Sequence, residues 1–115
     1  MQSNIYGKRS EIIAADYLKE KGYKILQNNY KNKVGEIDII AQDKDYIVFV
    51  EVKARMSQAF GHPLEAIDER KQEKIQAVAS IYLMQNKKYG TKCRFDAISI
   101  LGMDHPEIRH IIDAF

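Results

Sequence analysis

Two segments of the chain place their apolar residues at the three- and four-residue spacing of an amphipathic helix. The first covers about residues 4–21 and is followed by Gly22, a residue type that often ends helices. The second covers about residues 68–87 and opens with Asp68, a residue type that caps helix N-termini. The apolar stripes consist of Ala14, Ala15 and Leu18 in the first segment and Ile75, Val78, Ala79, Tyr82 and Leu83 in the second. Each stripe predicts a helix that packs one face on a core.

Five other segments are rich in β-branched and aromatic residues and predict strands. They cover residues 23–30, 35–42, 46–54, 94–101 and 108–114. Only the polar stretch Asp43-Lys44-Asp45 separates the second from the third, which predicts an antiparallel hairpin. Residues 56–64, which include Gly61 and Pro63, predict an irregular loop. The order helix, three strands, helix, two strands predicts one α/β domain over residues 1–115, with a mixed central sheet flanked by helices.

The third strand carries charged residues on a face that is otherwise apolar. Side chains alternate along a strand, so Ile47, Phe49, Glu51 and Lys53 share one face. Charged groups on a core-facing side are unfavourable unless they are paired or bound to a metal. This placement predicts a function for Glu51 and Lys53 and argues against an ordinary exposed hairpin face.

The register of the hairpin brings two carboxylates together. A turn over residues 43–46 pairs Gln42 with Ile47 and so places Asp38 opposite Glu51. Opposite Cβ atoms lie about 5 Å apart. Two negative charges at about 4 Å repel each other by roughly 4 kcal/mol at an effective dielectric of about 20. A divalent cation with hard oxygen ligands offsets this repulsion, so the sequence predicts a metal site here.

Three further charged residues extend the predicted site. Lys53 could orient an attacking water and offset charge on a phosphoryl oxygen, or form a salt bridge to Glu36. Glu11, on the core-facing stripe of the first helix, could be a third ligand or a solvated helix acid. Glu36 could be an auxiliary ligand, a hydrogen-bond partner or a surface residue. Two acids, a lysine and a metal that polarises phosphate are what phosphodiester hydrolysis requires.

Composition adds little to this picture. The 115 residues are 45% hydrophobic and 30% charged, as in ordinary globular proteins, and the net charge of +2 by itself favours an ordinary mixed surface. The basic residues nevertheless fall at segment ends, which predicts a basic rim around an acidic centre. Candidate nucleic-acid contacts on this rim are Lys8, Arg55 and Lys71. Lys71 could reach the phosphate that is cut or extend into solvent.

The remaining residue types point to a cytoplasmic protein without a zinc site. Cys93 is the single cysteine, which fits a reducing compartment, and no signal peptide or membrane span is recognisable. The histidines share no spacing, and we expect surface or loop positions for them. They are His62, His105 and His110. We expect Asp96 to be a buried, hydrogen-bonded strand acid. Core or rim packing, in preference to base stacking, is expected for Tyr6, Tyr30 and Tyr82.

Two stretches resemble the signature of PD-(D/E)xK nucleases. They are Gly35-Glu36-Ile37-Asp38, with Ile37 where the signature's name has proline, and Val50-Glu51-Val52-Lys53-Ala54-Arg55. With Gly7-x-x-x-Glu11 and the ending Asp113-Ala114-Phe115, nearly the whole chain resembles the YraN-like family of small bacterial proteins. That family is similar to archaeal Holliday-junction resolvases.

The resemblance implies a restriction-endonuclease-like fold and a magnesium-dependent endonuclease, with manganese able to substitute. By position, Glu11, Asp38 and Glu51 would be the metal ligands and Lys53 the catalytic lysine. The implied substrate is nucleic acid, as structured or branched DNA, and resolvase-like action would require a homodimer with two active sites. Two alternatives stay open: a non-catalytic nucleic-acid-binding or adaptor protein that retains a nuclease fold, and a structural partner in a larger complex.

Overall fold

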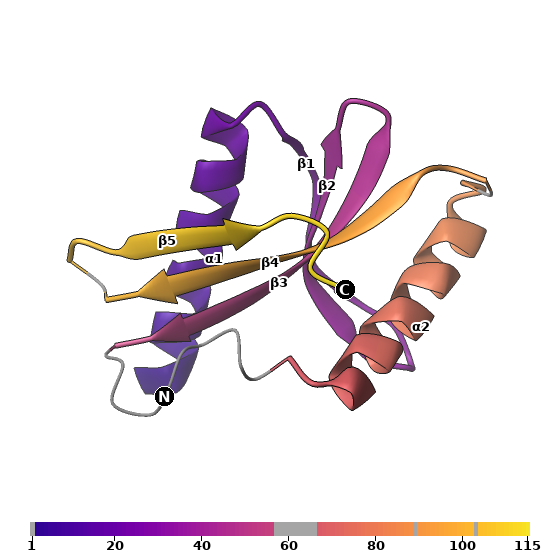
Figure 1. The fold of residues 1–115 in the computed structure, drawn as a ribbon. Coiled ribbons are helices and arrows are strands. Elements are labelled where there is room, and N and C mark those ends of the chain that lie inside the picture. The colour runs from indigo at the N-terminus through magenta and orange to yellow at the C-terminus, as the bar shows by residue number, and fades with distance from the viewer. Residues whose placement is uncertain (1, 57–66, 89, 103) are drawn as a thin grey trace.

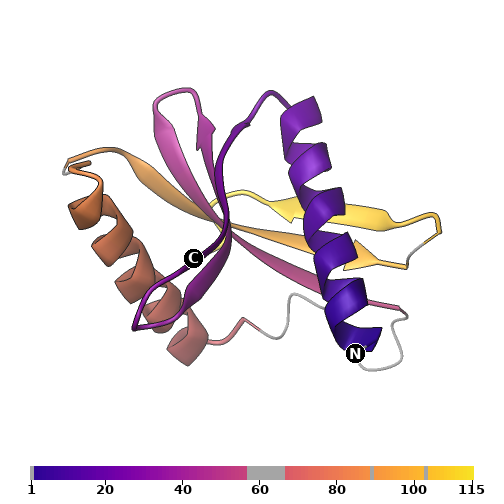
Figure 2. The ribbon, with the colours of Figure 1, turned by 180° about the vertical axis from the view of Figure 1, so that it is seen from behind.

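The chain forms one five-stranded sheet with a helix on each face, as Figures 1 and 2 show from opposite sides. The computed structural model describes residues 2–56, 67–88, 90–102 and 104–115, with side chains from residue 7 onward. The elements are α1 (Gln2–Glu20), β1 (Lys24–Lys31), β2 (Glu36–Asp43), β3 (Tyr46–Arg55), α2 (Glu69–Gln85), β4 (Cys93–Leu101) and β5 (Glu107–Ile111). All seven were predicted, and the α/β class is confirmed. The predicted loop over 56–64 lies outside the described residues except for Met56.

The strands follow their sequence order across the sheet, β1-β2-β3-β4-β5. Only β3 and β4 run parallel, and the connection between them contains α2. The other three neighbouring pairs are antiparallel. A mixed sheet with helices on both faces is compatible with the predicted restriction-endonuclease-like fold.

Two hydrophobic clusters fasten the helices to the sheet. The cluster under α1 contains Ala14, Ala15, Leu18, Tyr23, Ile39, Ala41, Val48, Val50, Ile98 and Ile100. The cluster under α2 contains Tyr30, Ile37, Ile40, Ile47, Phe49, Ile75, Val78, Ala79 and Tyr82. The two helical stripes and the alternation along β3 are therefore confirmed. Burial of this apolar area is the main force that holds the three layers together.

The ends of several elements follow from individual residues. Gly22, with φ of +93°, ends α1 in the left-handed region that favours glycine. Asp68 caps α2, because its side chain accepts a hydrogen bond from the Lys71 N–H at 2.9 Å. The predicted end of the last strand at residue 114 is wrong, since β5 ends at Ile111. The chain turns at Asp113, with φ of +58°, and the Ala114 N–H then donates to the carbonyl oxygen of Phe95 at 2.7 Å.

The register of the β2–β3 hairpin was predicted correctly, with Gln42 opposite Ile47. The backbone pairing of the two strands ends at Ile39 and Val50, one step before Asp38 and Glu51. Ile37 packs under α2 together with Ile40, so the simple alternation of β2 is interrupted at Asp38. The interruption leaves the first part of β2 free to diverge from β3 and lets a side chain occupy the space between them.

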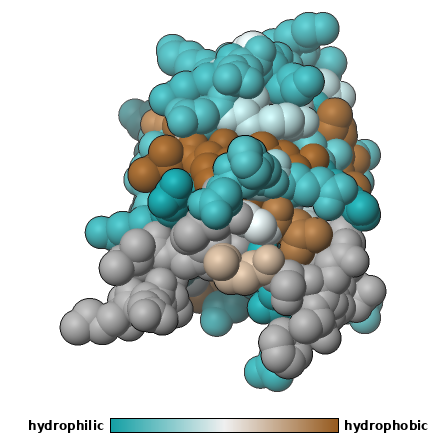
Figure 3. All heavy atoms as spheres, turned by 90° about the vertical axis from the view of Figure 1, so that its left-hand side faces the viewer, coloured by the Kyte–Doolittle hydropathy of each residue, from teal (hydrophilic) through white to brown (hydrophobic). Residues whose placement is uncertain are grey.

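The surface mixes hydrophilic regions with a band of hydrophobic side chains. Figure 3 shows this band across the end of the molecule at which β3 and β4 finish. The exposed large apolar residues are Ile12, Tyr46, Met56, Met84, Ile111 and Ile112. Within the described part of the chain, neither helix combines the length and the apolar character needed to cross a membrane.

Candidate active site

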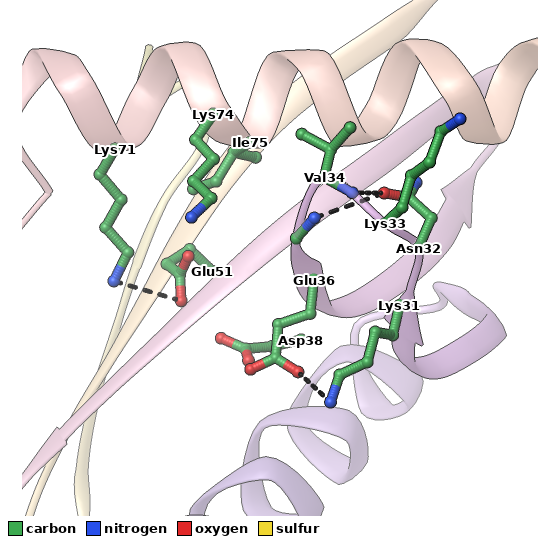
Figure 4. A pocket seen from close by; sticks show the side chains of 11 residues that line it. Lys31, Asn32, Lys33, Val34, Glu36, Asp38, Glu51, Lys71, Lys74 and Ile75 are labelled. Atoms are coloured by element: carbon green, nitrogen blue, oxygen red, sulfur yellow. Dashed lines mark hydrogen bonds and ion pairs between the residues drawn. The ribbon is translucent and has the colours of Figure 1, made fainter.

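Asp38 and Glu51 meet in a pocket between α2 and the turn that joins β1 to β2 (Figure 4). The pocket has a volume of about 430 Å³. Glu51 projects from β3 and is only 9% exposed, whereas Asp38 is half-buried at the point where the ladder stops. The Val52 N–H donates to Asp38 Oδ2 at 2.8 Å, so this carboxylate takes the place of the next ladder bond. The two carboxyl groups that the register was expected to bring together are therefore neighbours.

The neighbourhood of Glu51 disfavours two negative charges. Burial raises the pKa of Glu51 to about 8, with the hydrogen bond to Asp38 and the charge of Asp38 adding to the effect. The positive charges of Lys71 and Lys53 oppose this shift without cancelling it. At neutral pH the metal-free pocket therefore holds a proton between the two acids. Such a shared proton marks a place where a cation could replace it.

Two lysines face the carboxyl pair. Lys71, from the first turns of α2, places its Nζ 3.9 Å from Glu51 Oε1. Lys71 therefore lies beside Glu51 with its side chain 34% exposed, and its contact with a phosphate stays a prediction. Burial lowers the pKa of Lys53, and a hydrogen-bond contact with Lys71 lowers it further, while Glu51 and Asp38 raise it. The site thus holds two acids and two lysines within mutual electrostatic reach.

Glu36 does not pair with Lys53. Its ion pair is with Lys31 of β1, at 3.9 Å between Nζ and Oε2, and both side chains are largely exposed. The salt-bridge alternative for Lys53 is thus excluded for the described residues. Glu36 lines the pocket beside Asp38, so an auxiliary role for it stays a prediction.

Glu11 approaches Asp38 from a different side. It lines a separate hollow of about 360 Å³ between α1 and β1, together with Lys8 and Asn29. Burial raises the pKa of Glu11 and the charge of Asp38 raises it further, whereas a hydrogen bond to Asn29 lowers it. The charge of Asp38 therefore acts on the Glu11 carboxyl group, but Glu11 does not line the pocket that contains Glu51. Among the residues that the structure describes, no three His, Cys, Asp or Glu side chains are gathered closely enough to hold a metal.

The other predicted contacts lie away from the carboxyl pair. Lys8 is exposed on α1, and Arg55 is exposed at the end of β3, so their contact with nucleic acid stays a prediction. Tyr30 and Tyr82 are buried, with ring centroids 5.1 Å apart, which confirms core packing for both. The side chain of Tyr6 lies outside the described residues.

A second polar cluster corrects one prediction and confirms another. Asp96 is fully buried and accepts hydrogen bonds from Arg94 Nε at 2.9 Å and from the Asp113 N–H at 3.0 Å. His110 Nε2 lies 2.7 Å from Asp96 Oδ2, and its side chain is only 6% exposed. The prediction of a surface or loop position is wrong for His110, because alternation along β5 turns it inward. His105 is exposed as expected, and His62 lies outside the described residues.

Several residues of the pocket were not identified from the sequence as site residues. They are Lys31, Asn32, Lys33, Gly35 and Lys74. Lys74 follows Lys71 by three residues, a spacing that places both on one side of a helix, and this signal could have found it. The contribution of the β1–β2 turn had no such signal, because it depends on how α2 packs against the turn.

Comparison with known proteins places the chain in a family. Residues 10–100 match the family described as "Uncharacterised protein family UPF0102". The chain is 44% identical over 115 residues to a UPF0102 protein of Clostridioides difficile strain 630, with all of both chains covered. It is 46% identical over 113 residues to a UPF0102 protein of Caldanaerobacter subterraneus subsp. tengcongensis, covering 95% of this chain and 93% of that one. A UPF0102 protein of Persephonella marina is 44% identical over 115 residues, covering 100% and 97%. The chain therefore belongs to the UPF0102 family, the YraN-like family that its motifs resemble.

Proposed function

We propose that the protein is a metal-dependent nuclease that hydrolyses phosphodiester bonds in nucleic acid. The names of the relatives given above state no activity, so the support comes from the pocket. The single observation that carries the proposal is the pair of neighbouring carboxyl groups of Asp38 and Glu51 in an open pocket, faced by Lys53 and Lys71. Ordinary structural packing gives no reason to place two acids in contact.

The donor groups fit a divalent cation. Asp38 and Glu51 would hold Mg²⁺ or Mn²⁺ through carboxylate oxygens, the donors that these hard cations prefer. Glu11 lines a separate hollow, so it would act as a third ligand only if its side chain turned toward Asp38 on ion binding. Loss of the shared proton would leave both carboxylates ionised, which is the form that binds a cation. When bound, a divalent cation polarises a phosphoryl oxygen and lowers the pKa of a coordinated water.

The remaining side chains have separate tasks in the proposed reaction. The Val52 N–H holds the Asp38 carboxylate in a fixed orientation through its 2.8 Å hydrogen bond. The ammonium of Lys53 would orient the attacking water and stabilise negative charge as it develops on the phosphoryl oxygen. Lys71 would hold Glu51 in place before substrate arrives and contact the phosphate afterwards. Because β3 is paired with β2 on one side and with β4 from Ile47 to Arg55, these groups start from a rigid frame.

The proposed substrate is DNA with a structured or branched form. Four lysines line the pocket against three acids, which favours a polyanion over a neutral ligand. We propose a branched form because the motifs resemble a family that is similar to Holliday-junction resolvases. Cleavage of a four-way junction would in addition require a homodimer, because each of two strands must meet an active site.

A cleavage panel tests the proposal. Linear, flapped and four-way DNA would be incubated with Mg²⁺ or Mn²⁺, with a chelator as the negative control. We expect wild-type protein to cut at least one substrate, and Asp38→Ala and Glu51→Ala to abolish cleavage while the thermal unfolding transition is kept. Asp38→Asn is the matched variant, since it keeps the volume of the side chain and removes its charge. Cleavage by these variants at the wild-type rate would show that the acids are not the active site.

A non-catalytic nucleic-acid-binding or adaptor protein is the second candidate. One observation favours it: among the described residues, no third acidic side chain lies close enough to Asp38 and Glu51 to form a three-ligand metal site. The two candidates differ in ion binding. A nuclease is expected to bind Mg²⁺ or Mn²⁺ saturably at Asp38 and Glu51, and an adaptor is expected to bind DNA equally well with or without the ion.

A further inference from the structure

The pocket continues from the two acids toward the β1–β2 turn, and further lysines line it. Lys31 ends β1, Lys33 lies in the turn, and Lys74 comes from α2. Lys31 is paired with Glu36, and Lys71 is paired with Glu51. Lys74 makes no ion pair with any residue that the structure describes, so its charge is available to a ligand.

The turn that faces Lys74 has a fixed shape. Asn32 Oδ1 accepts hydrogen bonds from the N–H groups of Val34 at 2.9 Å and Gly35 at 3.4 Å. Its Nδ2 donates to Tyr30 Oη at 3.1 Å and to the carbonyl oxygen of Val78 at 3.4 Å. The second pair of bonds ties the turn to β1 and to α2. The distance between the turn and the helix is therefore set by Asn32.

Gly35 leaves the space that the stem of Lys74 occupies. A Cβ atom at Gly35 would lie 3.2 Å from Lys74 Cε and 3.3 Å from Val78 Cγ2, closer than ordinary side-chain contact. Gly35 has no positive φ, so backbone strain does not explain the glycine here. Figure 4 shows Lys74 leaving α2 on the side of Lys71 and directing its ammonium toward the acids. A Cβ atom at position 35 would require the Lys74 stem to shift by a few tenths of an ångström.

We propose that Lys74 binds the backbone phosphate next to the one that is cut, and that Gly35 is a positioning residue for Lys74, an assignment that rests on the nuclease function proposed above. The carboxyl pair and its two lysines account for one phosphodiester. A cation on the pocket wall, free of ion pairs and directed by packing across Gly35, suits the next phosphate along the strand. Under this proposal, the glycine of the Gly35-Glu36-Ile37-Asp38 motif is needed to leave room for the Lys74 stem.

Binding to DNA tests the contact without any need for cleavage. The affinity of the full chain for a fluorescent single-stranded DNA oligonucleotide would be measured over a series of salt concentrations, with a chelator present. We expect Lys74→Gln to weaken binding and to reduce the slope of log K against log salt by about 0.7, the value for one phosphate contact on a single strand. Lys74→Arg should keep the wild-type slope. Lys88→Gln, which changes an exposed lysine beyond the far end of α2, is the control and should change neither quantity.

A double-variant cycle tests the role of Gly35. Gly35→Ala alone should weaken binding in the same direction as Lys74→Gln and by no more than it, because the added Cβ shifts the stem of Lys74. In the Lys74→Gln background, Gly35→Ala should cause no further loss of binding. A further loss of equal size would show that Gly35 acts independently of Lys74 and would overturn the positioning role. Thermal unfolding of each variant separates this result from simple misfolding.

A small substrate identifies which phosphate Lys74 contacts. Bis(p-nitrophenyl) phosphate contains one phosphodiester and no neighbouring phosphate. Lys74→Gln should raise KM for cleaved DNA by a larger factor than it changes KM for this small substrate, and an equal change for both substrates would overturn the neighbouring-phosphate assignment. Wild-type DNA binding by Lys74→Gln overturns the subsite, even if Asp38→Asn still abolishes cleavage and the nuclease proposal stands. A Lys74-dependent salt slope in a protein that never cuts DNA would keep the phosphate contact and reject the nuclease.

Discussion

Two buried acids on neighbouring strands have opposite electrostatic surroundings. Asp96 in β4 is surrounded by donors: Arg94, His110 and the N–H of Asp113. Burial alone would raise the pKa of Asp96, but the hydrogen bonds from His110, Arg94 and Asp113 lower it below its ordinary value. Glu51 in β3 faces another acid, and its pKa is raised to about 8.

The comparison shows that burial of a charged residue does not by itself mark a functional site. In the Asp96 cluster, the fold supplies every partner that the carboxylate needs, and Arg94 also reaches Asp43 at 3.2 Å. In the Asp38–Glu51 pocket, the fold brings two acids into contact, and their repulsion is relieved only by a bound proton or by a cation from solution. A buried acid with its own cation is structural, whereas a buried acid that faces another acid in an open pocket is the candidate for chemistry.

The largest expected difference between the two regions is in stability. Asp96→Ala leaves the Arg94 guanidinium, which is 12% exposed, without its main partner, and also frees His110. Loss of one partner in a buried ion pair typically lowers the free energy of unfolding by about 3–5 kcal/mol. Urea unfolding measures this change, and Asp104→Ala in an exposed turn is the control, with a change within about 0.5 kcal/mol. A small change in the free energy of unfolding of Asp96→Ala would show that the Asp96 cluster does not stabilise the fold.

Lys53→Ala should separate activity from stability. Loss of one group that stabilises a developing negative charge slows cleavage by about 10²–10³-fold. The free energy of unfolding should change little, because burial and the contact with Lys71 both disfavour the charged form of Lys53. Single-turnover cleavage, with ion binding measured in parallel, checks both points, and the variant should still bind the metal. Unchanged single-turnover rates would exclude Lys53 from the mechanism.

The third expected effect is a pH-dependent gain of stability in Glu51→Gln. Because the folded pKa of Glu51 is raised from its ordinary 4.5 to about 8, the folded state holds the proton where the unfolded state has lost it. The stability of the metal-free wild type should therefore fall relative to Glu51→Gln as pH rises from 4.5 to about 8, and the difference should level off above that.

Unfolding in the presence of a chelator, across this pH range, measures the difference between the two proteins. Glu73→Gln, on an exposed face of α2, is the control and should show no such trend. The pH dependence of stability that arises from Asp96 has the opposite sign. Its pKa is lowered in the folded state, so the stability that it adds is lost only as pH falls below 3.8, the ordinary pKa of an aspartate. A flat difference between wild type and Glu51→Gln would mean that the two acids do not share a proton.

Local pattern was enough to predict the helices, the strands and the hairpin register. The pairing of Gln42 with Ile47 follows from the short turn beside it, and that pairing brings the acids at 38 and 51 together. Periods of 2 and 3.6 residues identified the faces of the strands and helices, because they depend only on backbone geometry. Alternation along β5 turns His110 inward in the same way, so its burial also follows from strand geometry.

Packing between distant segments determined the rest. Lys71 reaches Glu51 and Lys74 lines the same pocket because α2 lies across the start of β2, and Gly35 contacts a side chain that is 39 positions away. Glu11 faces a separate hollow, because α1 covers the opposite face of the sheet from α2. The partners of Asp96 come from β5 and from the C-terminal turn. None of these contacts has a local signature, since each depends on the angle and distance at which whole elements pack, and these are set by the combined shape of many apolar side chains.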